Sequence, residues 1–119
     1  LMPELSLLEN IKYFLFNDNI NEKMISDILN KYELESFKSD LVRDFSSGMI
    51  KRSEIAIADL KNPKVLCIDE PRVYLDENGV DLLLNLITKR EKEGSTSILS
   101  SQESIGAFTS IERSFNLND

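Results

Sequence analysis

Cysteine is nearly absent from this chain, and long apolar stretches are absent altogether. Cys67 is the only cysteine, so no disulfide can form within the chain and a reducing compartment is expected. No apolar run approaches the roughly 18 residues that a membrane-spanning helix requires. The first residues also lack the basic start and the clean apolar stretch of a secretory signal. These absences exclude a disulfide framework and a membrane-spanning segment within this sequence.

Basic residues are outnumbered by acidic ones. The sequence has 14 Lys and Arg against 21 Asp and Glu, a formal net charge of −7. A protein that binds duplex nucleic acid needs a basic face to neutralise phosphates, so we expect no nucleic-acid partner. The same balance is compatible with a nucleotide site, because one Mg2+ ion and a few backbone amides are enough to hold a triphosphate.

Glycine and proline are scarce, with four and three residues, while 41% of the chain is hydrophobic. This composition predicts a folded chain and excludes intrinsic disorder. A length of 119 residues allows one compact core and no more than one domain.

The first third of the sequence predicts helices. Ser6 and Glu9 form a capping box at the start of a helix expected over residues 6–17, and Asn21 is a plausible cap for a second one. We expect residues 1–45 to form a small helical subdomain. Three aromatic residues of its first helix are interpreted as core, with a docking surface for a membrane partner as the alternative: Tyr13, Phe14 and Phe16.

The remainder, residues 46–119, predicts an α/β unit. A helix is expected from Ser46 to about residue 60, where Asn62 and Pro63 end it. Further elements alternate between strand and helix: a strand at 65–68, a helix at 76–92, a strand at 96–100 and a short strand at 111–117. The first strand is continuously apolar, which is typical of a strand buried on both faces, and Cys67 is interpreted as a filler of that core. This order predicts a parallel α/β architecture.

Two carboxylates follow the first strand directly. Ligands of open α/β sheets bind outside the carboxyl ends of the strands, where Asp69 and Glu70 are expected. One carboxylate there can hold a hydrated Mg2+, and a neighbouring one can orient a water for attack on a γ-phosphate. The alternative is that both side chains are merely solvated residues of a turn.

Two helix starts provide further candidates. Ser46, Ser47 and Gly48 open one helix, where unpaired amides and a hydroxyl can face an anion. Asp76 opens the next helix. Taken alone, each of these segments is more often a plain helix cap, and for Asp76 both roles are compatible.

The order of these segments resembles the ATP-binding-cassette (ABC) family of ATPases. That family has a signature usually written Leu-Ser-Gly-Gly-Gln, then a helix, then four apolar residues with Asp-Glu-Pro (the Walker B segment), then Leu-Asp (the D-loop). Five segments of this chain are similar, in the family's order: 5–11, 45–49, 65–71, 75–76 and 94–103. The resemblance covers essentially the whole chain. It implies the C-terminal part of an ABC ATPase, with a parallel sheet like that of P-loop NTPases and a helical subdomain before it.

The resemblance also implies roles and cofactors, namely ATP and Mg2+. Asp69 would hold the Mg2+, and Glu70 would be the general base that orients the attacking water. Ser46, Ser47 and Gly48 would contact a nucleotide bound to a second ABC ATPase subunit in a head-to-tail dimer. Asp76 would lie at the dimer interface, and Gln102 stands where the family has its switch histidine.

The departures from the family pattern are substantial. The chain contains no histidine, and Gln102 can donate and accept hydrogen bonds but cannot carry a proton. Ser47 and Met49 replace a signature glycine and glutamine, and Ile57 stands in place of an arginine. The phosphate-binding P-loop, Gly-x-x-x-x-Gly-Lys-Ser/Thr, is missing. We therefore expect weakened or lost hydrolysis and a chain that is not stable alone. A P-loop-bearing N-terminal half is expected as a partner, either as a separate chain or as a missing segment of a longer protein.

Three functions remain open at this point. The first is an ATPase subunit of a membrane transporter, of the type that exports haem in cytochrome c maturation (CcmA type), whose residues 5–45 face an integral membrane subunit. It would be peripheral on a membrane, on the matrix side of the mitochondrial inner membrane or the bacterial cytoplasmic face. The second is a degenerate, inactive cassette with a structural or regulatory role. The third is a soluble ABC protein of translation or repair.

Overall fold

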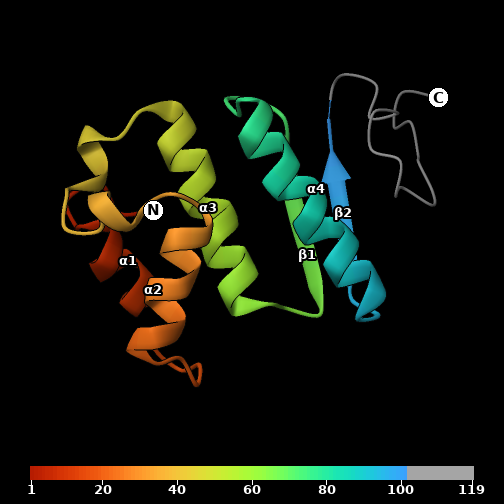
Figure 1. Ribbon diagram of the computed structural model, residues 1–119, viewed down its shortest axis with the longest axis horizontal. Coiled ribbons are helices and arrows are strands. Elements are labelled where there is room, and N and C mark those ends of the chain that lie inside the picture. Colours follow the sequence, from red (N-terminus) through yellow and green to blue (C-terminus); the bar gives the residue numbers. More distant parts are fainter. Residues whose placement is uncertain (102–119) are drawn as a thin grey trace.

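The computed structural model describes residues 1–101. In chain order the elements are α1 (Leu7–Phe14), α2 (Glu22–Lys31), two short 3-10 helices (Glu35–Phe37 and Val42–Asp44), α3 (Ser47–Lys61), β1 (Val65–Asp69), α4 (Glu77–Lys92) and β2 (Thr96–Ser100). The first helices lie at one end, α3 in the middle, and α4 with the two strands at the other end (Figure 1). Gln102 and the strand predicted at 111–117 lie outside the described residues.

The two N-terminal helices begin where their caps predict. Ser6 Oγ accepts from the Glu9 amide at 3.1 Å, and the Glu9 carboxylate accepts from the Ser6 amide at 3.0 Å, so the capping box is confirmed. The Asn21 side chain accepts from the Met24 amide at 2.8 Å at the start of α2. Both helices pack an apolar stripe inward, with Leu7, Ile11, Ile25 and Leu29 among the buried residues.

The aromatic residues at the end of α1 and just beyond it are on the surface. The exposed fraction is 64% for Tyr13, 41% for Phe14 and 82% for Phe16, so their interpretation as core is wrong. The reason is that α1 ends at Phe14, and the chain then turns away, so that only Leu15 of this stretch continues the buried stripe. Tyr13 and Phe14 instead contact each other edge to face, with ring centroids 5.5 Å apart.

Helix α3 begins and ends at the residues that the sequence indicated. The Ser46 side chain accepts from the Met49 amide at 3.1 Å at its start. At its end Asn62 adopts a left-handed conformation with φ 46°, and Pro63 cannot continue a helix. The helix is therefore continuous from the signature segment (residues 45–49) to the residues just before the first strand.

The strands and α4 form the α/β part. β1 and β2 pair in parallel, with Val65 opposite Thr96 and Asp69 opposite Ser100, and α4 is the crossover between them. Asp76 caps α4, and Gly94 closes it with φ 79°. The predicted α/β class is thus confirmed, although the sheet has only these two strands within residues 1–101.

Burial of the first strand differs from its prediction. Leu66 and Ile68 are buried, but Val65 is 56% exposed and Cys67 is exposed as well, so burial on both faces is wrong for the described chain and Cys67 is not a core filler. On β2, Ile98 is 52% exposed. Registered partners in parallel strands share a face. Val65, Cys67, Thr96 and Ile98 therefore form one uncovered surface, here called the open sheet face.

Arg90 joins the starts of both strands to the end of α3. Its side chain is fully buried, and it donates hydrogen bonds to Ser97 Oγ at 2.9 Å, to Asn62 Oδ1 at 3.2 Å, and to the carbonyls of Pro63 and Thr96 at 2.8 Å. The guanidinium is thus satisfied by neutral oxygens, which explains how a charged residue can occupy the core.

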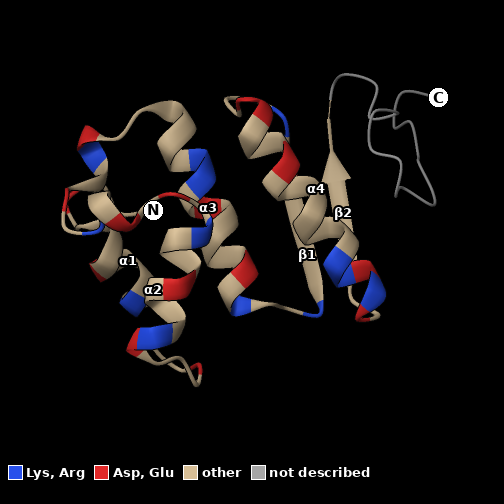
Figure 2. Ribbon diagram, viewed as in Figure 1, with Lys and Arg blue, Asp and Glu red and all other residues tan. Residues whose placement is uncertain are grey.

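Charges of both signs are interspersed along the helices (Figure 2). None of the helices within residues 1–101 has the length and the apolar character that crossing a bilayer demands.

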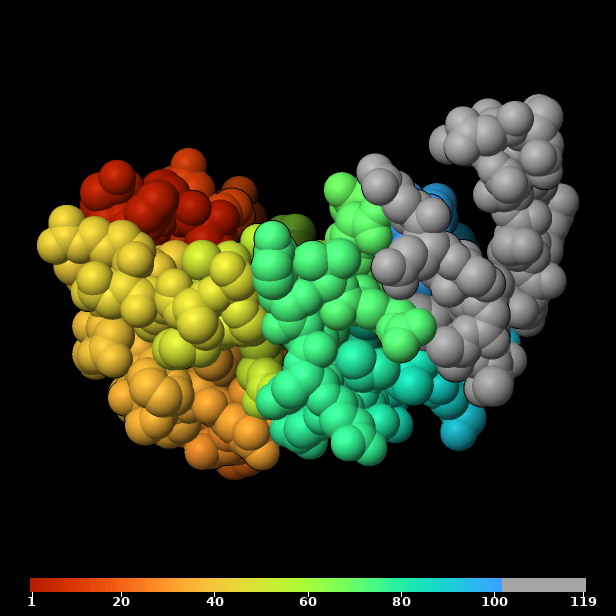
Figure 3. All heavy atoms as spheres, turned by 90° about the horizontal axis from the view of Figure 1, so that it is seen from above, coloured from red at the N-terminus to blue at the C-terminus, as the bar shows by residue number. Residues whose placement is uncertain are grey.

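A buried carboxylate connects three helices. Asp59 of α3 accepts hydrogen bonds from Lys31 Nζ at 2.7 Å and Tyr32 Oη at 2.8 Å, at the end of α2, and from Lys89 Nζ of α4 at 2.9 Å. The space-filling view shows α3 between the N-terminal helices and α4 (Figure 3). Burial opposes ionisation of Asp59, but the hydrogen bonds from Lys31, Lys89 and Tyr32 together outweigh it and hold the pKa of Asp59 below its usual value.

Replacing this carboxylate tests its contribution to stability. We expect Asp59→Asn to lower the free energy of unfolding by about 2–4 kcal/mol, because it leaves two ammonium groups without their buried counter-ion. Asp27→Asn, which breaks only the exposed Lys23–Asp27 pair, should cost less than about 0.5 kcal/mol. Urea unfolding followed by circular dichroism measures both in the assembly with the P-loop-bearing half, because the chain is not expected to be stable alone.

The lowered pKa of Asp59 predicts that the stabilisation by this carboxylate depends on pH. A lowered pKa in the folded state means that the stabilisation is present above the unfolded-state pKa of about 4 and is lost as the pH falls through the folded value. The stability difference between wild type and Asp59→Asn should therefore shrink on acidification below pH ~4. A difference that stays constant down to pH ~2 would contradict the assignment.

Candidate functional site

Asp69 and Glu70 lie at the carboxyl end of β1, beside the end of β2. Ser100 Oγ donates to Asp69 Oδ1 at 2.6 Å, and the Ser100 carbonyl accepts from the Glu70 amide at 2.7 Å. Ser101 Oγ donates to Glu70 Oε2 at 3.3 Å. The two carboxylates thus stand where open α/β sheets bind ligands, and they are oriented by Ser100, the last residue of β2, and by Ser101, which follows it.

This end of the sheet suits a divalent cation of the Mg2+ type. The Asp69 carboxylate is exposed and adjoins the Ser100 hydroxyl, which gives hard oxygen ligands open to solvent. No cluster of three or more metal-binding side chains occurs within residues 1–101. Mg2+ is commonly held by one or two carboxylates plus water and phosphate oxygens, so a sparse oxygen set of this kind fits it.

Backbone strain marks the segment that follows. Glu70 has φ 48° and Tyr74 has φ 69°, the left-handed region that non-glycine residues seldom adopt. Two turns span this stretch, in which the Val73 amide donates to the Glu70 carbonyl and the Leu75 amide to the Arg72 carbonyl. The strain falls on the predicted general base and just before Asp76.

The cap and first residues of α3, Ser46 to Gly48 (here called the signature turn), contact the strained segment of residues 70–74 directly. A Cβ added to Gly48 would lie 2.9 Å from the Tyr74 carbonyl oxygen, so only glycine allows this approach. Ser46 Oγ is used as the α3 cap, which confirms the plain capping role. Ser47 is exposed in the same turn.

Asp76 also has a structural role. Its Oδ1 accepts from the Gly79 amide at 2.7 Å, which caps α4, and from Arg52 Nη2 at 2.8 Å. Arg52 Nη1 donates to Glu33 Oε2 at 3.0 Å, just beyond α2. Asp76 is thereby attached to α3 and, through Arg52, to the helical part.

Lys51, Arg52 and Ser100 are functional neighbours whose contacts the sequence analysis did not predict. Lys51 Nζ donates to the Asp69 carbonyl at 2.8 Å. Gly48, Lys51 and Arg52 are spaced i, i+3 and i+4, so they share one face of α3. This spacing could have indicated the contacts from the sequence, because residues that share a helix face with Gly48 lie beside the same neighbouring segment.

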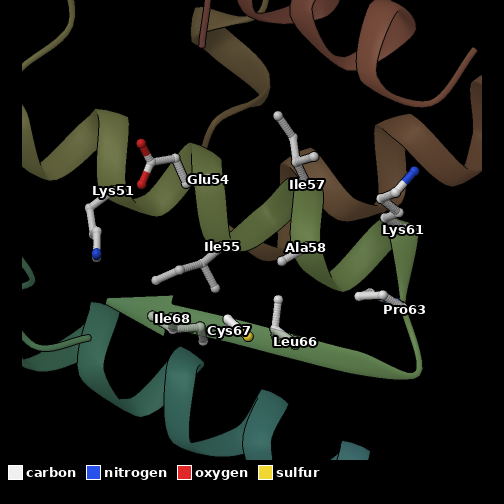
Figure 4. A pocket seen from close by; sticks show the side chains of 10 residues that line it. All are labelled: Lys51, Glu54, Ile55, Ile57, Ala58, Lys61, Pro63, Leu66, Cys67 and Ile68. Carbon is white, nitrogen blue, oxygen red and sulfur yellow. The ribbon is translucent and has the colours of Figure 1, made fainter. Parts of the chain in front are cut away.

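An apolar groove of about 280 Å3 runs between α3 and β1. Ile55 and Ala58 of α3 point toward Leu66 and Ile68 of β1, with Lys51 at one end (Figure 4). Within residues 1–101 the partner of β1 is β2 alone, on the other edge. The groove lacks converging polar groups at its centre, so it suits an apolar segment of protein better than a small molecule.

The comparisons with known proteins agree with this geometry. The sequence profile of the ABC transporter family matches residues 1–73, more than half of the chain. The chain belongs to this family. The match extends from the helical part through Asp69 and Glu70.

Several ABC relatives are similar to the chain. The lantibiotic transport ATP-binding protein SrtF of Streptococcus pyogenes is 36% identical over 101 residues, covering 85% of this chain and 44% of that protein. The cytochrome c biogenesis ATP-binding export protein CcmA of Histophilus somni is 31% identical over 105 residues, covering 87% of this chain and 48% of that protein. The chain thus spans about half the length of the curated relatives it matches.

Solved ABC structures confirm the fold. An ATP-binding subunit of an ABC transporter superposes with a TM-score of 0.76 at 28% identity, covering 85% of this chain and 44% of that one. A dimeric ATP-binding cassette in a post-hydrolysis state with ADP and phosphate superposes with a TM-score of 0.71 at 27% identity, covering 87% of this chain and 48% of that one.

Gln102 lies outside the described residues, and its role stays a prediction.

The close approach of Gly48 to Tyr74 generates a stability prediction. Gly48→Ala places a methyl group against a backbone oxygen, and we expect a net loss of about 1 kcal/mol in the free energy of unfolding. Ser47→Ala, which adds no atom in the same exposed turn, should stay within about 0.5 kcal/mol of wild type. Equal stability of the two variants in thermal unfolding would show that the signature turn does not press on Tyr74.

Proposed function

We propose that this chain is part of an ATP-binding and ATP-hydrolysing subunit of an ABC transporter. The observation that carries the proposal is the placement of Asp69 and Glu70 at the end of a parallel strand, in a chain whose signature turn touches the adjoining segment. Membership of the ABC family and the structural similarity to a cassette with ADP and phosphate support it.

The residue roles follow from the positions described. Asp69 would hold Mg2+, which supplies neutralisation of phosphate charge when bound. Glu70, oriented by Ser101, would accept a hydrogen bond from the attacking water and act as the general base. Gln102 would hydrogen-bond the phosphate or the water without carrying a proton.

The start of α3 would recognise a nucleotide held by a second subunit. Ser46, Ser47 and Gly48 open a helix of 15 residues, whose N-terminal amides and dipole favour an anion. Asp76 would contact the second subunit through its exposed carboxylate, since its side chain is 70% exposed despite the Arg52 contact. The dimeric cassette among the similar structures supports a dimer.

A P-loop-bearing half is the partner that this function requires. The apolar surface that the described residues leave uncovered supports such a partner, because the open sheet face and the groove beside β1 would be shielded by it. An integral membrane subunit is the second proposed partner, and the exposed Tyr13, Phe14 and Phe16 on the helical part would suit its docking. The division at residues 45 and 46 stays a prediction.

The cargo stays a prediction as well. The cytochrome c maturation type has support from CcmA, but relatives named for lantibiotic transport are at least as similar. A mitochondrial site has no further support, while a peripheral position at a membrane follows from the transporter proposal. Comparing the membrane subunits that co-purify would distinguish haem export from the other cargoes.

Substitution of Glu70 tests hydrolysis. We expect Glu70→Gln to lower kcat for ATP about 10^2- to 10^4-fold in the assembly purified from the native source, because the amide cannot accept the proton of water. Glu91→Gln, an exposed glutamate of the last turn of α4, is the matched control and should leave kcat unchanged. Mass spectrometry of the same preparation identifies the P-loop-bearing polypeptide.

The competing hypothesis is a degenerate cassette that docks without hydrolysing ATP. Gln102, Ser47 and Met49 favour it, whereas the oriented carboxylates of Asp69 and Glu70 oppose it. An assembly without a P-loop and without Glu70-dependent turnover would refute the ATPase proposal and leave a structural role.

A further inference from the structure

Helix α3 contacts the segment from Asp69 to Asp76 at three points. Lys51 Nζ donates to the Asp69 carbonyl at 2.8 Å, and Arg52 Nη2 donates to Asp76 Oδ1 at 2.8 Å. Between them, the Gly48 backbone lies against the Tyr74 carbonyl. Both ends of the segment are thus hydrogen-bonded to the first two turns of one helix, and the Tyr74 carbonyl lies close to the same turns.

The first of these contacts acts on the peptide that leads into Glu70. The Asp69 carbonyl belongs to the peptide group whose amide is that of Glu70, and this amide donates to the Ser100 carbonyl at 2.7 Å. Lys51 therefore fixes the oxygen of a peptide plane whose N–H is fixed by β2. A fixed plane matters here because Glu70 has φ 48°, a conformation that surrounding contacts must maintain.

The second contact fixes the other end of the segment. Arg52 is only 14% exposed and is held on its far side by Glu33, which itself has φ 59°. Its planar guanidinium lies between the Glu33 and Asp76 carboxylates and donates to both. Asp76 in turn caps α4, so the segment cannot shift at this end without loss of the cap.

We propose that Lys51 and Arg52 are positioning residues that hold Glu70 in its reactive conformation. This inference rests on the proposed ATPase function. Lys51 and Arg52 attach the two ends of the segment from Asp69 to Asp76 to α3.

Hydrogen exchange tests the attachments without requiring hydrolysis. In the assembly purified from the native source, amide exchange of Glu70, Val73 and Leu75 would be compared between wild type and Lys51→Met. Loss of one hydrogen bond to the segment should speed exchange of these amides about three- to tenfold. Lys51→Arg keeps a donor and should restore slow exchange, and Lys92→Met, in the last turn of α4, is the control.

Kinetics on the same variants separate positioning from a general loss of structure. Lys51→Met and Arg52→Met should lower kcat about three- to tenfold with the KM for ATP within about twofold of wild type, because neither side chain is placed on the nucleotide. Thermal unfolding of the assembly should be little changed for Lys51→Met, whose bond is exposed.

The outcomes distinguish the two proposals. Unchanged exchange of Glu70, Val73 and Leu75 in Lys51→Met would overturn the positioning role, whatever the ATPase result. Faster exchange in Lys51→Met, found together with a wild-type assembly that hydrolyses no ATP, would refute the ATPase proposal while the attachment of the segment by Lys51 stands. Faster exchange with an unchanged kcat would also overturn the positioning role.

Discussion

The buried carboxylate of Asp59 is the contact on which the arrangement of the two parts depends. It receives hydrogen bonds from the end of α2 and from α4 while belonging to α3, so three helices meet at one group. A helix held in this way from both sides cannot rotate alone. The position of the N-terminal end of α3, where Gly48 approaches the Tyr74 carbonyl, therefore depends on the contacts of Asp59 as well. Arg52 repeats the arrangement nearer the site, between Glu33 and Asp76.

Much of the fold could be predicted because local chemistry decides it. The caps at Ser6, Asn21, Ser46 and Asp76 and the stop at Asn62 are short-range features, and each is confirmed. Exposure could not be predicted in the same way. Phe14 fits a helical stripe in sequence, but the end of α1 leaves it outside the core, and the apolar run at Val65 is uncovered on one face. Apolar character indicates a tendency to be buried, and the neighbours decide whether burial occurs.

For the site, the sequence predicted which residues stand at the strand end and at the helix starts. It could not predict that Ser100 orients Asp69, or that Lys51 reaches the Asp69 carbonyl. These contacts join residues far apart in the chain and depend on how α3 lies against β1. The buried Arg90 belongs to the same class, since its neutral acceptors come from the ends of three elements.

The open sheet face has a practical consequence through Cys67. This thiol is the only one in the chain and lies on that face, beside Val65 and opposite Ile98. A thiol reagent reaches it while the face is bare and is shut out once another surface lies against it. The reactivity of this native side chain, read on this chain alone, therefore reports whether the face is covered, with no second cysteine in the chain to contribute to the signal.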